Sequence, residues 1–331
     1  MEAGLSRDGE CRAYRISDFI ALWRGRFSVG KGLFLMQFQL PLIYPYSFEL
    51  TTKRLRTFEK TSFVADGDKL SRTIHGSRGP LLCTVGPPAG EKALRVEIEG
   101  NLAEGEAEEL KRKVARMFST QVDLTPFYEQ MRDHPVLAPV IAEREGLHFV
   151  LEPSLYECVV KTIIGQQLNV SFAATLIQRF QELAGSKAVF RGREWVLFPT
   201  PEQVARLEYE ELQALQFNRR KAEYIIDFSR KVVNGELPLE ALWSLSDKEV
   251  LHTLLPIRGI GRWTVECVLL FGLGRPDLLP AADIGLRNAL KRVYGLDHQP
   301  GEEEVRQWGE SWAPYRSYVT FYLWDSLDNV K

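Results

Sequence analysis

A glycine-rich segment followed by one aspartate is the most chemically suggestive feature of the sequence. Gly259 and Gly261 flank Ile260, and an apolar helical pattern begins at Trp263. Because glycine turns through left-handed conformations at little cost, the pattern predicts a helix, a hairpin over 256–263 and a second helix. Main-chain N–H groups at such a hairpin, beside a helix N-terminus, form an anion site.

Two arginines and the local charge indicate which anion this site would hold. Arg258 and Arg262 flank the hairpin, and between His252 and Gly295 the basic residues outnumber the acidic ones by three. The whole chain is nearly balanced, with 42 Lys and Arg against 44 Asp and Glu. The pattern favours a DNA phosphate, gripped without regard to base. An ordinary glycine turn between two packed helices remains the alternative.

Asp283 stands 20 residues after Trp263, immediately before a helical pattern that includes Leu286. Aspartate is a favoured N-cap, so a purely structural role explains its position. A carboxylate one helix away from a DNA-gripping hairpin is also a candidate for stabilising a cation. The two interpretations are compatible, because a helix N-terminus favours a negative charge.

The N-terminal part of the chain predicts an α+β domain over 37–125. Short β-rich segments indicate strands, the clearest being "LRVEIEG" at its end, and "SFELTTK" at 47–53 is among them. Strict alternation indicates a sheet with one wet face. Leu110, Val114 and Met117 then recur at helical spacing, which predicts an amphipathic helix on that sheet. Residues 1–36 have no sustained periodicity, so we expect a poorly ordered leader and a possible native start at Met36.

The remainder, 126–331, predicts an all-α domain of short helices. Ser154 with Glu157, and Ser246 with Glu249, form capping boxes, and Thr200 precedes a proline at the first helical position. A short insertion at 190–198 predicts a small hairpin or loop. The basic segment 218–221 is expected to be a solvated helix start.

Composition excludes several classes of protein. The four cysteines form no CxxC pair, which argues against a zinc site, an iron–sulfur cluster and a disulfide framework. No apolar run reaches the ~18 residues of a membrane span, and no signal peptide is evident. We therefore expect a cytoplasmic protein with no membrane partner, and a monomer.

Taken together, "IRGIGRWTVE" and "GRPDLLPAADIGLRNAL" resemble the helix-hairpin-helix DNA glycosylases, specifically the 3-methyladenine DNA glycosylase II branch. Segments 163–170, 198–207 and 312–324 agree in order and spacing. The resemblance is strong over 150–328, weaker over 37–150 and absent from 1–36. It implies an α+β domain followed by an all-α glycosylase domain, acting in base excision repair.

The resemblance also implies a mechanism. The family flips a damaged nucleotide out of duplex DNA and hydrolyses its N-glycosidic bond. Asp283 would stabilise the positive charge that develops on the sugar and orient the attacking water. Trp263 stands where strand-nicking members carry a lysine, so the enzyme should be monofunctional and leave an abasic site.

Further site residues follow from the same resemblance. Trp263 and Trp324 match positions that line the base pocket, although aromatic residues on buried helices are more often core. Gln167 matches the residue that fills the gap left by the flipped base. Cys267 and Ile284 stand where a relative can carry tyrosine, which leaves base preference open. Arg316 would contact phosphate or form an internal ion pair.

We expect double-stranded DNA containing alkylated purines as the partner, and no organic cofactor. Side-chain metal ligands are not implied, although similar hairpins can hold a monovalent cation on main-chain carbonyls. Two alternatives stay open. One is a non-catalytic helix-hairpin-helix DNA-binding protein, and the other is a glycosylase for a neutral damaged base.

Overall fold

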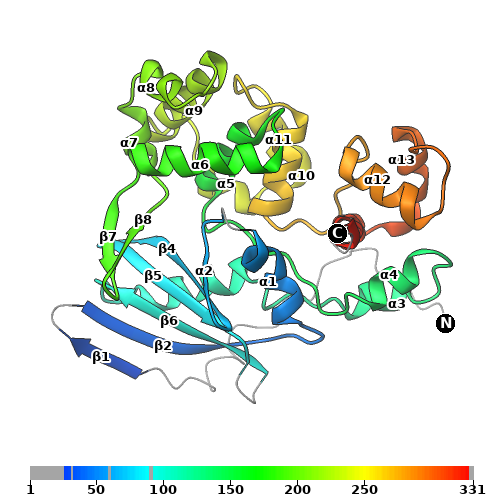
Figure 1. The fold of residues 1–331 in the computed structure, drawn as a ribbon, viewed down its shortest axis with the longest axis horizontal. Coiled ribbons are helices and arrows are strands. Elements are labelled where there is room, and N and C mark those ends of the chain that lie inside the picture. Colours follow the sequence, from blue (N-terminus) through cyan, green and yellow to red (C-terminus); the bar gives the residue numbers. More distant parts are fainter. Residues whose placement is uncertain (1–25, 31–32, 59–60, 89–91, 328–331) are drawn as a thin grey trace, which may run out of the picture.

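An antiparallel sheet forms one side of the molecule (Figure 1). The computed structural model describes residues 26–30, 33–58, 61–88 and 92–327. All six strands pair antiparallel, in the order β1-β2-β6-β5-β4-β3. Their bounds are β1 (Arg26–Gly30), β2 (Leu33–Pro41), β3 (Val64–Asp66), β4 (Lys69–Gly76), β5 (Gly79–Gly86) and β6 (Ala93–Gly100).

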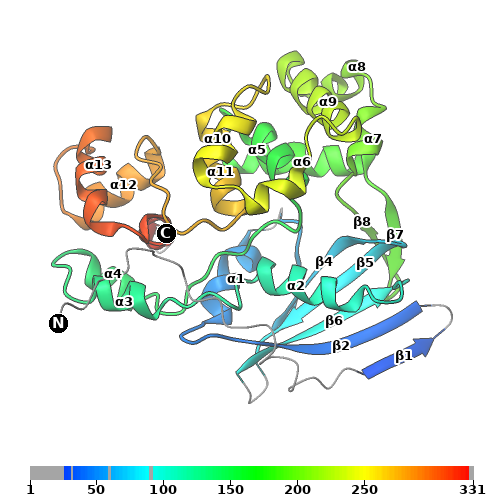
Figure 2. The same ribbon diagram turned by 180° about the vertical axis from the view of Figure 1, so that it is seen from behind.

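Helix α2 (Ala107–Met117) lies against this sheet, as Figure 2 shows. Its Leu110, Val114 and Met117 are at most 1% exposed and share a core with strand residues such as Ile98. The predicted amphipathic helix is therefore confirmed, because its apolar stripe faces the sheet.

One expected strand is wrong. Segment 47–53 belongs to a helix, α1 (Phe48–Thr57). The Ser47 hydroxyl accepts a hydrogen bond from the Leu50 amide at 3.2 Å, which caps the helix start. Buried Thr52 donates to the Phe48 carbonyl at 2.7 Å, so its hydroxyl is satisfied inside the helix. The cap and these local bonds override the strand preference of the paired threonines.

The sheet also begins earlier than expected. β1 and the start of β2 fall within 1–36, so the expectation of a poorly ordered leader is wrong for its last part. Residues 1–25 lie outside the described residues. Met36 itself lies in β2, paired with Ile98 and 1% exposed. The native start at Met36 and the domain division after 125 stay predictions.

Beyond the sheet the chain is almost entirely helical, as predicted. The elements are α3 (Thr125–Met131), α4 (Leu137–Ala142), α5 (Leu155–Gly165), α6 (Val170–Ala184), α7 (Pro201–Ala205), α8 (Tyr209–Ala214), α9 (Arg219–Val233), η2 (Leu239–Ser244), α10 (Asp247–Leu254), α11 (Arg262–Cys267), η3 (Val268–Gly272), α12 (Ile284–Val293), α13 (Glu302–Gly309), η4 (Glu310–Trp312) and α14 (Arg316–Leu327). Here η2 and η4 are 3₁₀ turns and η3 is a π-helical turn.

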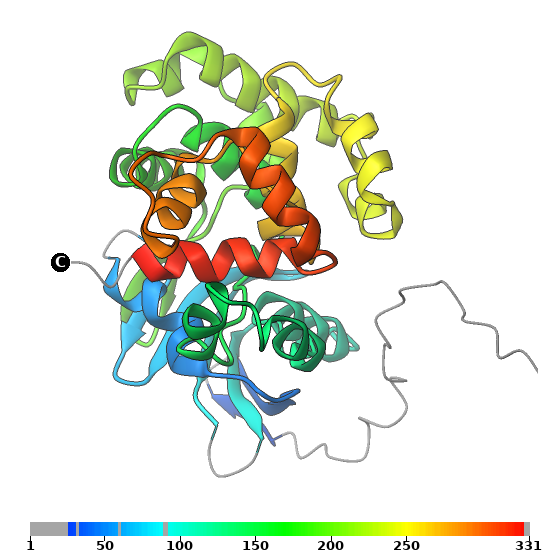
Figure 3. The ribbon, with the colours of Figure 1, turned by 90° about the vertical axis from the view of Figure 1, so that its right-hand side faces the viewer.

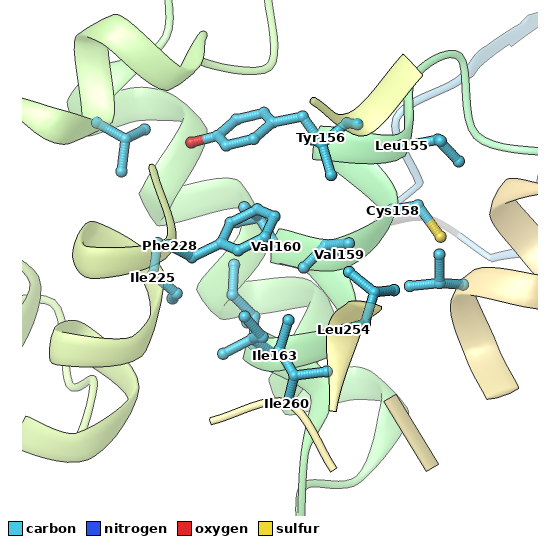
Figure 4. Close-up of a cluster of buried hydrophobic side chains, with 14 of the residues drawn as sticks. Leu155, Tyr156, Cys158, Val159, Val160, Ile163, Ile225, Phe228, Leu254 and Ile260 are labelled. Carbon is cyan, nitrogen blue, oxygen red and sulfur yellow. The ribbon is translucent and has the colours of Figure 1, made fainter. Parts of the chain in front are cut away.

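These helices enclose two hydrophobic cores. The first surrounds α5, with α9, α10 and α11 packed around it, and Figure 4 shows α5 side chains facing Ile225, Leu254 and Ile260. The second surrounds α14. In Figure 3 the red α14 runs between the orange α12–α13 segment and the green α3–α4 segment.

The expected helix starts are confirmed. Ser154 caps α5 by accepting a hydrogen bond from the Glu157 amide, but the capping box expected there is wrong, because the Glu157 carboxylate binds Arg72 and Lys161 instead. Thr200 and Ser246 each form a full capping box, at α7 and α10. The predicted hairpin in the insertion is also present, as β7 (Lys187–Phe190) paired with β8 (Arg193–Val196).

A buried charge network joins the sheet to the first helical core. Arg72 on β4 binds Glu157 on α5 at 2.7 Å, and Lys161 binds the same carboxylate at 2.6 Å. Glu152 completes the network with both cations. Burial raises the pKa of Glu157, but Arg72 and then Lys161 outweigh burial and hold it at about 2. The network fixes α5 against the sheet, because removing one partner would leave a buried charge.

Candidate catalytic and DNA-binding site

The predicted hairpin connects α10 to α11, and its first glycine is required twice over. Gly259 has φ +90°, which side-chain-bearing residues rarely adopt. A Cβ atom there would also collide with the Tyr224 ring. Gly261 has φ −96° and open space where a Cβ would lie, so neither reason applies to it. Ile260, between them, is 5% exposed and anchors the hairpin in the first core (Figure 4).

A side-chain amide holds the hairpin to the end of α5. Gln166 Nε2 donates to the Gly259 carbonyl at 2.8 Å and to Thr264 Oγ1 at 2.9 Å. This agrees with a structural role for Gln166. The next residue, Gln167, is exposed and has φ +54°. The hairpin and the 166–167 loop are therefore neighbours, although about 90 residues of sequence separate them.

Two adjoining pockets open beside this contact, and both include Gln166, Gln167 and Gly261. The first, of about 320 Å³, is completed by Trp263 and Thr264. The second, of about 390 Å³, is completed by Gly259, Ile260 and four residues from the start of α9: Asn218, Arg220, Lys221 and Tyr224. The structure thus brings together Gln167, the hairpin glycines and Trp263, all of which the sequence predicted as site residues.

The two flanking arginines do not line these pockets. Arg258 binds Glu223 at 2.5 Å and lies over the Tyr224 ring, while Arg262 binds Glu266 at 3.1 Å on its own helix. Both side chains stay well exposed, at 63% and 69%. Their positive charge is therefore partly neutralised by carboxylates, and one of these, Glu223, lies outside the range 252–295 over which the local charge was counted.

The expectation for 218–221 is wrong for Lys221, which is 6% exposed. The sequence could have predicted this burial, since Lys221 precedes Ile225 and Ser229 by four and eight residues and so lies on the same helix face. Arg220 lines the second pocket, and within the described ranges no hydrogen bond or ion pair engages its side chain. Arg220 is therefore a cation that sequence reasoning missed.

Asp283 is the N-cap of α12, as predicted, and its orientation is fixed by two donors on one oxygen. Oδ1 accepts from the Leu286 amide at 2.7 Å and from Trp324 Nε1 at 2.9 Å. Oδ2 has no hydrogen-bond partner in the part of the chain that the structure describes. One carboxylate oxygen therefore aims the group, and the other remains available to a substrate.

The Trp324 indole is itself held in place. It stacks on Phe271 with ring centroids 6.2 Å apart and an interplanar angle of 21°. Gly285 lets the indole approach the acid, because a Cβ there would lie 3.0 Å from Asp283 Oδ1 and 3.4 Å from Trp324 Nε1. Trp324 therefore positions the carboxylate, in addition to any contact with a base.

Helix α11 links the hairpin to the acid. Trp263, 45% exposed, lies in its first turn, and Cys267 is its last residue. Burial, together with repulsion of the thiolate by Glu266 and Asp283, raises the pKa of Cys267 to about 12. The Cys267 thiol is thus a neutral group close to Asp283. Ile284, beside the acid, is 66% exposed.

Of the two roles expected for Arg316, phosphate contact and an internal ion pair, the structure shows the ion pair. It forms two bonds of 2.6 Å to the Asp277 carboxylate, one from Nε and one from Nη2. This bidentate pair joins α14 to the segment that leads to Asp283.

The hairpin carbonyls suit the cation that the resemblance allows. Those of Leu254, Ile257 and Gly259 accept hydrogen bonds within the protein. Those of Arg258 and Ile260 accept none among the described residues. Main-chain oxygens of this kind are ligands for a monovalent cation.

Comparison with known proteins places this geometry in a family. Residues 160–314 match the model of the HhH-GPD superfamily of base excision DNA repair proteins. The chain is 38% identical over 289 residues to Bacillus subtilis YfjP, a protein named for DNA-3-methyladenine glycosylase activity, spanning 86% of this chain and 96% of that one. The chain belongs to the HhH-GPD superfamily. A second Bacillus subtilis relative, a DNA-3-methyladenine glycosylase, is 34% identical over 66% of this chain and 73% of its own.

Solved structures of the superfamily agree. The 3-methyladenine DNA glycosylase of Archaeoglobus fulgidus superposes with a TM-score of 0.77 and 26% identity, over 88% of this chain and 99% of that one. The Schizosaccharomyces pombe enzyme Mag1, solved with abasic DNA, gives 0.52 and 28% identity, over 62% and 97%. The α+β domain followed by a helix-hairpin-helix domain is therefore confirmed. No helix among the described residues is long and apolar enough to cross a membrane.

Proposed function

We propose that this protein is a monofunctional DNA glycosylase that excises alkylated purines, of the 3-methyladenine and 7-methylguanine type, from duplex DNA. The observation that carries the proposal is the Asp283 carboxylate, with one oxygen held by Leu286 and Trp324 and the other without a partner in the described structure. The activities for which the relatives are named support the alkylated substrate.

The chemistry follows from the charge of the substrate. An alkylated purine such as 3-methyladenine is cationic and already a good leaving group, so the site has little need of a general acid. The sugar becomes positively charged as the base departs. Asp283 Oδ2 stabilises that charge and orients water toward it, and Trp324 keeps the carboxylate in place. One acid is therefore sufficient for hydrolysis.

The DNA lies across the hairpin. The main-chain amides of Gly259 and Gly261 hold a phosphate together with Arg220, and Arg258 and Arg262 add longer-range attraction from their exposed positions. A monovalent cation on the Arg258 and Ile260 carbonyls would supply further positive charge for that phosphate. The residues act in one chain, as a monomer, on DNA in the cytoplasm.

The flipped base lies between the hairpin and the acid. Trp263 and Trp324 supply aromatic surfaces for it, and Gln167 occupies the gap that it leaves in the stack. Strand cleavage does not follow, because Trp263 has no amine to attack the sugar. Lys221 is not a substitute, since its ammonium is held by two carbonyls.

The test is base release from methylated duplex DNA, followed by strand analysis without alkali. Wild type should release 3-methyladenine and leave unbroken strands, while Asp283→Asn should bind the duplex and release almost nothing. Equal release by both proteins would remove Asp283 from its role. Duplex binding without release by either would favour a non-catalytic DNA-binding protein, and release of only neutral bases would favour a different lesion class.

A further inference from the structure

Lys221, in the first turn of α9, is a buried cation with an unusual pair of partners. Its Nζ donates to the carbonyls of Ile164 and Gln166, both at 2.7 Å. These oxygens lie at the C-terminal end of α5, where helix carbonyls lack partners and the helix dipole is negative. Burial lowers the pKa of Lys221. An ammonium is placed here in spite of the cost of burying it, because it satisfies two main-chain acceptors.

The same short loop is held from its other side by the hairpin. Gln166 Nε2 donates to the Gly259 carbonyl and to Thr264 Oγ1. Lys221 therefore grips the main chain of 164–166 from α9, while the Gln166 side chain grips the hairpin. Three segments far apart in sequence become one unit around residue 166.

The consequence falls on Gln167. Its backbone is left-handed, with φ +54°, and its side chain is exposed at both pockets. For a residue other than glycine this conformation is unfavourable and persists only where its surroundings impose it. The described part of the chain gives no bond to the Gln167 side chain itself, so the bonds of its neighbours hold the conformation. The Leu168 amide donates to the Gly165 carbonyl at 3.2 Å across the turn, and Lys221 binds the carbonyls of Ile164 and Gln166.

We infer that Lys221 is a positioning residue for base flipping, which holds the 164–167 loop so that Gln167 projects beside the hairpin. The inference rests on the proposed function for its purpose, but its geometry does not depend on the lesion. Without the ammonium, the end of α5 relaxes and Gln167 no longer fills the gap reliably. The hairpin amides, which grip phosphate, stay in place.

The experiment measures gap filling and not catalysis. The probe is a duplex with a tetrahydrofuran abasic analogue, facing 2-aminopurine in the other strand, whose fluorescence reports insertion into the stack. At saturating protein, Lys221→Met should lower the insertion equilibrium about tenfold, the effect of losing hydrogen bonds to a charged group. Lys221 also lines the second pocket, so Lys221→Met should weaken duplex binding a few-fold, and for this reason the fluorescence is compared at saturating protein.

Two further variants separate positioning from general stability. Gln167→Ala should lose the same signal, and Lys221→Met added to it should cause no further loss, because both act through one side chain. Arg230 is the matched control. It lies on the same helix and likewise donates to two main-chain carbonyls, those of Ala205 and Leu207, away from the hairpin. Arg230→Met should lower the melting temperature and leave the fluorescence change intact.

Undiminished signal in Lys221→Met, additive losses with Gln167→Ala, or equal loss in Arg230→Met would each overturn the inference. So would a wild type that binds the probe without any fluorescence change. If Lys221→Met fails to fold, Lys221→Arg, which keeps the cation, should retain most of the signal, and its loss would count against positioning. A wild type that inserts but excises no alkylated base would sink the proposed function alone.

Discussion

The hairpin region and the acid region are built in opposite ways. Around the hairpin, Gln166 and Lys221 supply four hydrogen bonds to main-chain and side-chain oxygens, and the aliphatic Ile260 anchors the turn. Around Asp283, one helix amide and one indole hold a single carboxylate oxygen. The first region belongs to the core around α5 and the second to the core around α14.

The difference indicates how each region should respond to the substitution of a single residue. Under the proposed function, DNA binding is shared among amides and cations, so losing one group should weaken it in proportion. Catalysis would depend on one charge in one orientation, so losing that charge should abolish nearly all base release.

Replacing Asp283 with asparagine should lower single-turnover base release by ~100-fold to 1,000-fold, the range for removing one preorganised charge-stabilising group. Asparagine is as good an N-cap as aspartate, so the melting temperature should change little. Asp283→Ala is the comparison variant, since it also loses the cap and should cost about 1 kcal/mol in unfolding free energy. A large stability loss in Asp283→Asn would mean that its inactivity reflects the fold.

Gly259→Ala should weaken duplex binding, because the new Cβ meets the Tyr224 ring at a backbone conformation that alanine disfavours. Strain of about 2 kcal/mol corresponds to about a thirtyfold larger dissociation constant for the duplex. Gly261→Ala is the control in the same hairpin, with open space at its Cβ and a negative φ. Equal binding by the two variants, measured by fluorescence anisotropy, would show that the left-handed turn does not organise the grip.

Trp324→Phe should slow base release about fivefold, the effect of ~1 kcal/mol for one hydrogen bond. The ring can still stack on Phe271, so only the bond to Asp283 is lost. Trp308→Phe serves as the matched substitution, because Trp308 stacks on Tyr294 in the same core. Trp324→Phe should release the base more slowly than Trp308→Phe, even if the two variants have the same melting temperature. A normal rate in Trp324→Phe would assign the indole to base contact alone.

Arg220→Gln should produce the smallest effect, a few-fold weaker duplex binding and a salt dependence shallower by about one unit in slope, as for one lost phosphate contact. Its neighbour Arg219 is 77% exposed at its side chain and pairs with Glu223. Arg219→Gln should therefore change the slope less. Binding titrations across a salt series compare the slopes of the two variants. A larger change in slope for Arg219→Gln than for Arg220→Gln would mean that the phosphate does not bind in the second pocket.

The sequence alone determined the features that local chemistry dictates. The glycine hairpin, the caps at Ser154, Thr200 and Asp283, and the stripe of α2 all follow from short-range spacing, and the structure has them. The missed helix α1 shows the limit, because paired threonines favour a strand until a cap and buried hydroxyl bonds outweigh that preference.

Only the tertiary structure decided which groups meet. The bond from Trp324 to Asp283 spans 41 residues, the bond from Gln166 to Gly259 spans 93, and that from Lys221 to Ile164 spans 57. No periodicity encodes such pairs, because they arise where separate helices pack. The same packing gave Arg258 an acid partner from α9 and left Arg220 at the pocket. The residue types indicated the kind of chemistry, and long-range packing determined which groups lie close enough together to carry it out.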